Sequence, residues 1–199
     1  MEILYEDRDI AVVVKPVGLD SEKDVPNALQ QELGGSFYTV HRLDMNVGGI
    51  MVYARNQKAA GELSRQIQSG TFQKEYVALV HGTPEESGDW TDLLFKDSRK
   101  NKVFVVKKER SGVKKARLTY HRLTDSEQSL VRIRLYTGRS HQIRVQFASR
   151  GFPLVGDHKY GSKAKETAPM LYSCSLSFDL NGKTHFEKLP DWADSQSDK

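Results

Sequence analysis

The chain has 199 residues, of which 38% are hydrophobic and 28% charged, a composition typical of a globular protein with a packed core. Its formal net charge is +4, which by itself says only that a polyanion would not be repelled. The sequence holds no apolar run long enough for a membrane span, no pattern of a secretory signal, and one cysteine, which excludes an internal disulfide.

Apolar runs in the first half of the chain predict three buried strands, at residues 10–16, 48–55 and 74–82. Between the first two strands, residues 26–33 predict a short helix that two glycines end. Asn56 is then placed to cap a longer helix, which has apolar residues at three- and four-residue spacing and ends at Gly70.

The second half of the chain is richer in strands. Residues 103–108 and 116–123 lie on either side of Gly112 and predict a strand pair. Residues 129–138 alternate apolar and basic side chains, as a strand with one buried face does. Ser140 is expected to cap a short helix that closes near Gly151. Two late strands are predicted, at residues 170–180 and 184–189.

Many strands joined by hairpins, with few helices, predict an α+β fold: a mixed, largely antiparallel sheet flanked by a few helices. No internal repeat and no Pro/Gly-rich linker divides the sequence. We therefore expect a single domain over residues 1–193, followed by a frayed polar tail at residues 194–199.

Residues 38–56, YTVHRLDMNVGGIMVYARN, place a charged Arg-Leu-Asp step between apolar ends. Burial would raise the pKa of the Asp44 carboxyl unless a cation lay against it. Arg42 would share the face of Asp44 in a strand but could point elsewhere in a turn. An internal ion pair that fixes a strand crossing is one interpretation. A catalytic carboxylate is the other, and Gly48 and Gly49, which allow backbone or ligand to approach closely, favour it.

A second polar stretch is TGRSHQIR, residues 137–144, between a predicted strand and a predicted helix. It is either an anion pocket, built from Arg139, His141 and Gln142 beside a helix start, or an ordinary helix cap. Tyr76, in the strand KEYVALV, is by itself best read as a core aromatic.

Residues 96–122 carry far more Lys and Arg than Asp and Glu. This basic run is either a solvated hairpin or a surface that follows the phosphates of a nucleic acid, and the residues alone leave both interpretations open.

Together these stretches resemble the RluA-type RNA pseudouridine synthases. The family pattern joins a His-Arg-Leu-Asp step, a Lys-x-Tyr strand and a Thr-Gly-Arg-Ser/Thr-His-Gln turn. Here they stand in the same order as HRLDMNVGGIMVYARN, QKEYVALVHG and TGRSHQIRVQFASRGFPLVGDHKYG. The resemblance covers nearly the whole chain and implies the catalytic domain of that family without its N-terminal RNA-binding extension.

The resemblance also implies roles for single residues. Asp44 matches the catalytic aspartate, Tyr76 the tyrosine that stacks near the target base, and Arg144 the basic residue that pairs with the aspartate. Arg42 matches an arginine implicated in extruding the target nucleotide. Weaker candidates for RNA-phosphate or loop contacts are Arg139, His141 and Gln142.

The implied reaction converts a specific uridine of structured ribosomal or transfer RNA to pseudouridine. It is an isomerisation, so we expect no cofactor and no metal. We also expect RNA as the partner, no membrane association, a cytoplasmic location and a monomer. The sequence departs from the family pattern at Val47-Gly48, where Thr-Ser is usual, and at Gln146, where histidine is common.

Alternatives come from other functional classes. One is a non-catalytic RNA-binding protein or RNA chaperone on the same fold, with Asp44 idle. Another is a hydrolase or nuclease that uses His41 and Asp44, which the lack of metal-ligand spacing disfavours. A nucleotide-binding enzyme is disfavoured because no phosphate-loop or dinucleotide glycine pattern occurs.

Overall fold

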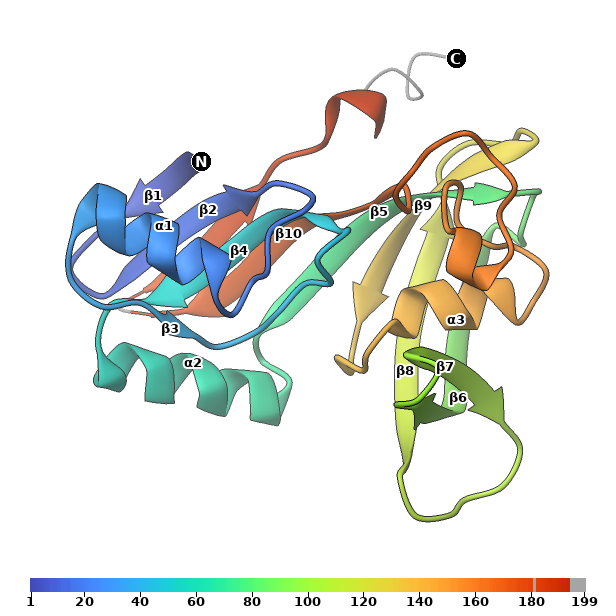
Figure 1. Cartoon of the computed structure of the whole chain (residues 1–199), viewed down its shortest axis with the longest axis horizontal. Helices are drawn as coiled ribbons and strands as arrows, with labels where there is room; N and C mark the ends of the chain where they lie inside the picture. The colour runs from blue at the N-terminus through green and yellow to red at the C-terminus, as the bar shows by residue number, and fades with distance from the viewer. Residues whose placement is uncertain (181, 194–199) are drawn as a thin grey trace. The chain divides into compact units, whose positions relative to one another are not determined.

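The structure, a computed structural model, describes residues 1–180 and 182–193, so the predicted tail at 194–199 lies outside the described residues (Figure 1). The chain divides into two compact units, and each is described by itself. Of the described residues, unit 1 holds 1–74, 172–180 and 182–190, and unit 2 holds 75–171 and 191–193. The single domain over residues 1–193 stays a prediction.

Unit 1 is a sheet with two helices. Its strands are β1 (Glu2–Glu6), β2 (Ile10–Lys15), β3 (Tyr38–Thr39), β4 (Gly48–Ala54), β10 (Leu171–Asp179, in this unit from Tyr172) and β11 (Lys183–Glu187). Their order is β1-β2-β4-β10, with β3 paired to β4 and β11 to β10. The β4–β10 pair is parallel and the other pairs of this unit are antiparallel. The helices are α1 (Asp24–Leu33) and α2 (Gln57–Ser69).

Helix α2 forms as the sequence predicts. The Asn56 side chain accepts a hydrogen bond from the backbone N–H of Ala59 at 2.9 Å, and Gly70 ends the helix in the left-handed conformation. Its apolar stripe packs on β2, β4 and β10, where Leu63 is fully buried. Burying one leucine side chain contributes about 2 kcal/mol to stability, so this contact fixes the helix on the sheet.

Strand β4 is buried along its whole length. Ile50, Val52 and Ala54 face the cluster formed with α2. On the other face the Tyr53 hydroxyl donates to the carbonyl of Ser21, in the segment before α1, at 2.8 Å. Because both faces are covered, β4 reads in the sequence as a continuous apolar run.

Unit 2 holds a second set of strands and two short helices. They are β5 (Gln73–His81, in this unit from Glu75), β6 (Ser87–Asp97), β7 (Lys102–Val106), β8 (Val113–Arg122), β9 (Gln128–Leu135), α3 (Gln142–Ala148) and the 3-10 helix η1 (His158–Tyr160). The strand order is β5-β9-β8-β6-β7. Helix α3 packs on the sheet through Phe147, whose ring contacts those of Trp90 and Tyr120 at 4.7 and 5.3 Å.

One predicted pairing is wrong. Strands β7 and β8 were expected to pair with each other, but each pairs with β6 in antiparallel register. Strand β6 was not predicted, because glycine, aspartate and lysine interrupt its apolar pattern. The fold class itself, α+β with a mixed and largely antiparallel sheet, is confirmed.

Candidate active site

Asp44 lies in a loop of unit 1 between β3 and β4. Its carbonyl accepts a hydrogen bond from the Val47 N–H at 3.0 Å, which closes a tight turn. The Asp44 residue is half-buried, whereas Arg42 is exposed and pairs with Glu22, with 3.1 Å between Nη1 and Oε2. The stretch is therefore a turn that displays charged groups, and not the strand that its apolar ends suggest.

Lys15, at the end of β2, lies beneath this loop, and sequence reasoning missed it. The residue is 0% exposed, and its Nζ donates to the carbonyls of Pro16 and Leu19 at 2.9 Å and of Met45 at 3.3 Å. The ammonium thus joins the segment after β2 to the residue that follows Asp44. The available signal was a lysine at the end of an apolar strand, where a buried charge requires partners.

Burial lowers the pKa of Lys15 to about 8, and the negative charges of Asp20, Asp44 and Asp24 oppose that shift. The interaction with Asp44 is attractive while Lys15 is protonated. A buried cation therefore acts on the candidate catalytic carboxylate from within unit 1.

His41, three residues before Asp44, is buried, and its side chain accepts a backbone hydrogen bond from β4. Its Nε2 accepts the backbone N–H of Val52 at 3.2 Å, just beyond the short β3–β4 pairing. Burial lowers its pKa to about 3, with a smaller contribution from the charge of Lys74. A histidine that is neutral at pH 7 and bonded to backbone is unsuited to general acid catalysis, which weakens the nuclease alternative.

The two glycines that follow Asp44 differ in what they contact. Gly49 has φ +126°, and a Cβ there would lie 2.4 Å from the backbone N and O of Ser173 in β10. At Gly48 the nearest atom to such a Cβ is the Lys15 carbonyl oxygen at 3.3 Å. The two glycines were expected to let backbone or ligand approach closely. At Gly49 it is the backbone of β10 that does so, because Ser173 pairs with this residue.

Tyr76 and Arg144 lie in unit 2. Tyr76 is on β5 and is 5% exposed. Arg144, on α3, is also buried and forms a two-pronged ion pair with Asp157: Nε lies 2.7 Å from Oδ2 and Nη2 lies 2.9 Å from Oδ1. The Arg144 Cζ lies 5.2 Å from the centre of the Tyr160 ring.

The loop before α3 is held from inside by Gln142. This residue is 3% exposed, and its Oε1 accepts from the Thr137 hydroxyl and the Arg139 N–H at 2.8 and 3.0 Å. Its Nε2 donates to the Arg117 carbonyl at 3.1 Å. Arg139 is exposed and His141 is half-buried, so these two residues present more surface than Gln142 does.

Ser140 does not cap α3, which corrects the prediction. The cap residue is His141, with φ 51° and no side-chain capping bond, and the helix begins at Gln142. The Gln142 side chain accepts from the Arg139 N–H and donates to the distant Arg117 carbonyl, and these bonds accompany the left-handed turn at His141 in place of a serine cap. Histidine is among the residues that tolerate this conformation better than most.

The basic run, residues 96–122, covers the end of β6 and all of β7 and β8, and we call its residues 96–117 the basic arm. It holds ten Lys or Arg against two Asp or Glu, a net charge of +8 in a chain of +4, so the remaining residues together carry −4. Cations lie over aromatic rings here: Arg110 over Phe95 at 4.4 Å, and Lys102 over Phe104 at 5.9 Å. Unit 2 therefore carries a concentrated positive surface.

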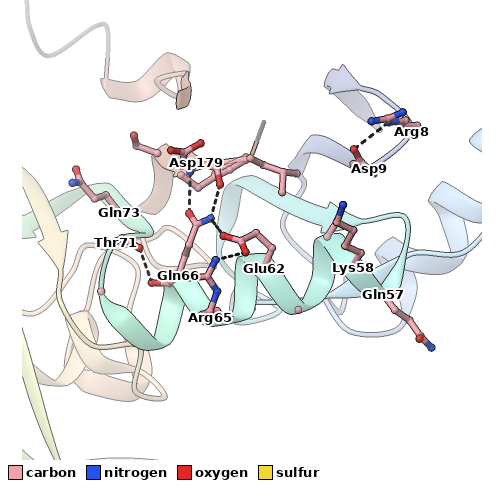
Figure 2. A pocket seen from close by; sticks show the side chains of 16 residues that line it. Arg8, Asp9, Gln57, Lys58, Glu62, Arg65, Gln66, Thr71, Gln73 and Asp179 are labelled. Atoms are coloured by element: carbon pink, nitrogen blue, oxygen red, sulfur yellow. Dashed lines mark hydrogen bonds and ion pairs between the residues drawn. The ribbon is translucent and has the colours of Figure 1, made fainter. Parts of the chain in front are cut away.

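A groove of about 1170 Å³ runs along α2 in unit 1, and Figure 2 shows its lining. Its lining holds three cations and three carboxylates: Arg8, Lys58 and Arg65, and Asp9, Glu62 and Asp179. Arg8 lies 3.4 Å from Asp9, Arg65 pairs with Glu62, and Gln66 bonds Glu62 and the backbone of Asp179. The predicted site residues are not among those that line it. Because its charges compensate one another, the groove lacks the single-sign field of a polyanion site.

Within residues 1–180 and 182–193, no helix is long and apolar enough to cross a membrane. The same residues contain no group of three or more His, Cys, Asp or Glu side chains placed to hold a metal ion.

Several known proteins are similar to this chain over most of its length. An uncharacterized RNA pseudouridine synthase of Aquifex aeolicus is 35% identical over 196 residues, which cover 88% of this chain and 62% of that protein. The chain thus spans less than two thirds of that relative. The dual-specificity RNA pseudouridine synthase RluA of Vibrio vulnificus is 34% identical, over 93% of this chain and 80% of that protein.

The solved structure of Human RNA Pseudouridylate Synthase Domain Containing 1 has the same fold, with a TM-score of 0.84 and 24% identity over 98% of this chain and 85% of that chain. A family model described as RNA pseudouridylate synthase matches residues 9–149, a range that includes Asp44, Tyr76 and Arg144. The chain therefore belongs to the RNA pseudouridylate synthase family, and its relatives place it in the RluA type.

Proposed function

We propose that this chain is an RNA pseudouridine synthase that isomerises a specific uridine in structured RNA. The observation that carries the proposal is that the family match over residues 9–149 contains Asp44, Tyr76 and Arg144 in their expected order. Relatives named for the large ribosomal subunit support ribosomal RNA as the substrate, and one named for dual specificity supports a second kind of RNA, which we propose is transfer RNA. We further propose that the protein works in the cytoplasm as a monomer.

In the proposed reaction the N1–C1′ bond of the uridine breaks, the uracil turns, and its C5 bonds to C1′. The C5 proton is lost and N1 gains a proton, so atoms and electrons balance without an oxidant. Asp44 acts either as the nucleophile or as the base that removes a sugar proton to form a glycal. Arg144 supplies a fixed positive charge to the reaction, and Tyr76 stacks near the base and assists proton transfer at C5.

The target nucleotide must leave its helix before Asp44 can reach the sugar, at a cost of a few kcal/mol. Phosphate contacts from the basic arm offset that cost. Arg42 takes part in extruding the nucleotide, and Arg139 and His141 contact the RNA. Gln142, whose amide is engaged within its loop, serves RNA binding by holding Arg139 in place.

The test is release of tritium from RNA labelled at uridine C5, because C5 loses its hydrogen only when it bonds to C1′. The wild-type chain should release tritium from ribosomal or transfer RNA transcripts. Asp44→Asn, which keeps the shape of the side chain, should release none while binding the same RNA with unchanged Kd. Mapping pseudouridines in total RNA with and without the gene identifies the target uridine.

The second candidate function is a non-catalytic RNA-binding protein, which the net charge of +8 on the basic arm would serve equally well. The two functions separate in one comparison. If the wild-type chain binds RNA but releases no tritium, and deletion of the gene leaves every pseudouridine in place, the binding function holds and the synthase proposal is wrong.

A further inference from the structure

The Arg144 guanidinium is buried and fixed on two sides by residues of unit 2. Its Nε donates to Asp157 Oδ2 at 2.7 Å and its Nη2 donates to Asp157 Oδ1 at 2.9 Å. Both side chains are almost fully buried. The Tyr160 ring lies 5.2 Å from Cζ. A carboxylate on one edge and an aromatic ring nearby together define the plane in which the guanidinium lies.

The residues that fix Arg144 are themselves fixed. Asp157 precedes η1, and the Tyr160 hydroxyl accepts the Val103 N–H and bonds His141 Nδ1, both at 2.9 Å. The segment that carries Asp157 is thus joined to β7 and to the loop before α3. Rotating the guanidinium would break two charge-assisted hydrogen bonds where no water can replace them.

We propose that Asp157 is a positioning residue that holds the Arg144 guanidinium in the one orientation in which its remaining N–H donors serve the reaction. The inference rests on the proposed function, in which Arg144 takes part in catalysis. A guanidinium presents donors on more than one edge, so a carboxylate bound at the Nε edge leaves the plane able to bind a second one. Asp157 touches no reacting atom and acts only through Arg144.

The test compares two isosteric changes at arginine–aspartate pairs, one whose arginine lies on α3 and one whose arginine follows that helix. Asp157→Asn removes the charge that fixes Arg144. The matched control is Asp92→Asn, which acts on another two-pronged pair, since Arg150 donates to Asp92 at 2.9 and 3.2 Å. Both variants weaken the packing of the same region, but only the first changes the surroundings of Arg144. Asp157→Glu restores the charge and is the rescue variant.

In single-turnover assays at saturating enzyme, Asp157→Asn should slow pseudouridine formation about 100-fold, because displacement of a catalytic group by about 1 Å has that effect. The Kd for RNA should stay unchanged, and Asp157→Glu should recover at least part of the rate. Asp92→Asn, corrected for its folded fraction, should keep the wild-type rate. A rate for Asp157→Asn within twofold of wild type would overturn the proposal.

Nitrogen NMR of the Arg144 side chain gives a readout that needs no activity. The wild-type Nε–H should exchange slowly with solvent, and exchange should be at least tenfold faster in Asp157→Asn but not in Asp92→Asn. An unchanged exchange rate in Asp157→Asn overturns the proposal even if the wild-type chain lacks synthase activity. If the wild-type chain lacks activity but exchange is faster in Asp157→Asn, the proposed function is wrong, whereas the conclusion that Asp157 fixes Arg144 still holds.

Discussion

Raising the pH should stabilise this protein through Lys15. Its amino group is buried with a pKa of about 8, whereas the usual value, which the unfolded chain should show, is 10.5. Between these two pH values the unfolded chain binds a proton that the folded chain does not. The free energy of unfolding therefore rises with pH in this window, and Lys15 contributes least to stability below about pH 8.

The difference between the two pKa values corresponds to a total change of about 3 kcal/mol in the free energy of unfolding. About 2.5 kcal/mol of this change occurs between pH 7 and pH 10. Other lysines, the tyrosines and Cys174 also titrate in this range. The comparison is therefore with Lys15→Met, which fills the same space without a titratable group. Subtracting the stability of the variant from that of the wild type at each pH leaves the contribution of Lys15.

Urea unfolding of both proteins at pH 7, 8, 9 and 10 measures this difference. It should grow by about 2.5 kcal/mol in favour of the wild type from the lowest pH to the highest. A difference that stays constant over this range would refute the reasoning. It would mean that the carbonyls of Pro16, Leu19 and Met45 keep the ammonium charged despite its burial.

Three other outcomes are expected. Because burial lowers the pKa of His41 to about 3, the wild type should lose about 2.5 kcal/mol more stability than His41→Gln when the pH falls from 7 to 4.5, as urea unfolding can measure. Gly49→Ala, whose Cβ would meet the Ser173 backbone at 2.4 Å, should cost about 4 kcal/mol in thermal unfolding, and Gly48→Ala much less; equal costs would contradict the packing. Replacing three exposed cations of the basic arm (Lys107, Lys108 and Arg110) by alanine should reduce the slope of log Kd for RNA against log salt by about 2, whereas replacing three exposed cations of unit 1 (Arg8, Lys23 and Lys58) should leave it unchanged.

Local rules located most helices and strands. Asn56 and Gly70 bound α2 as expected, because a capping side chain and a left-handed glycine act within a few residues of one another. The predicted alternation of apolar and basic side chains in β9 matches their burial: Val131 and Ile133 are buried, and Arg134 is half-buried. The partners of β7 and β8 did not follow from the sequence, because the interrupted apolar pattern of β6 concealed the strand to which both of them pair.

The sequence motifs, taken with the family resemblance, were enough to nominate Asp44, Tyr76 and Arg144. The residues that support them were not nominated. Lys15 stands as a single charge in an apolar stretch and Asp157 stands in a short polar segment, and only the folded chain brings three carbonyls to one and a guanidinium to the other.

The sequence by itself therefore determined the kinds of chemical group and the local elements, because these depend on neighbours a few residues apart. The tertiary structure decided which buried charge is compensated, and by what, because that depends on groups far apart in the chain. Arg144 and Asp157 are 13 residues apart, and Lys15 and Met45 are 30 apart. Without such partners a buried charge would destabilise the fold, so these contacts are as necessary to it as the apolar core.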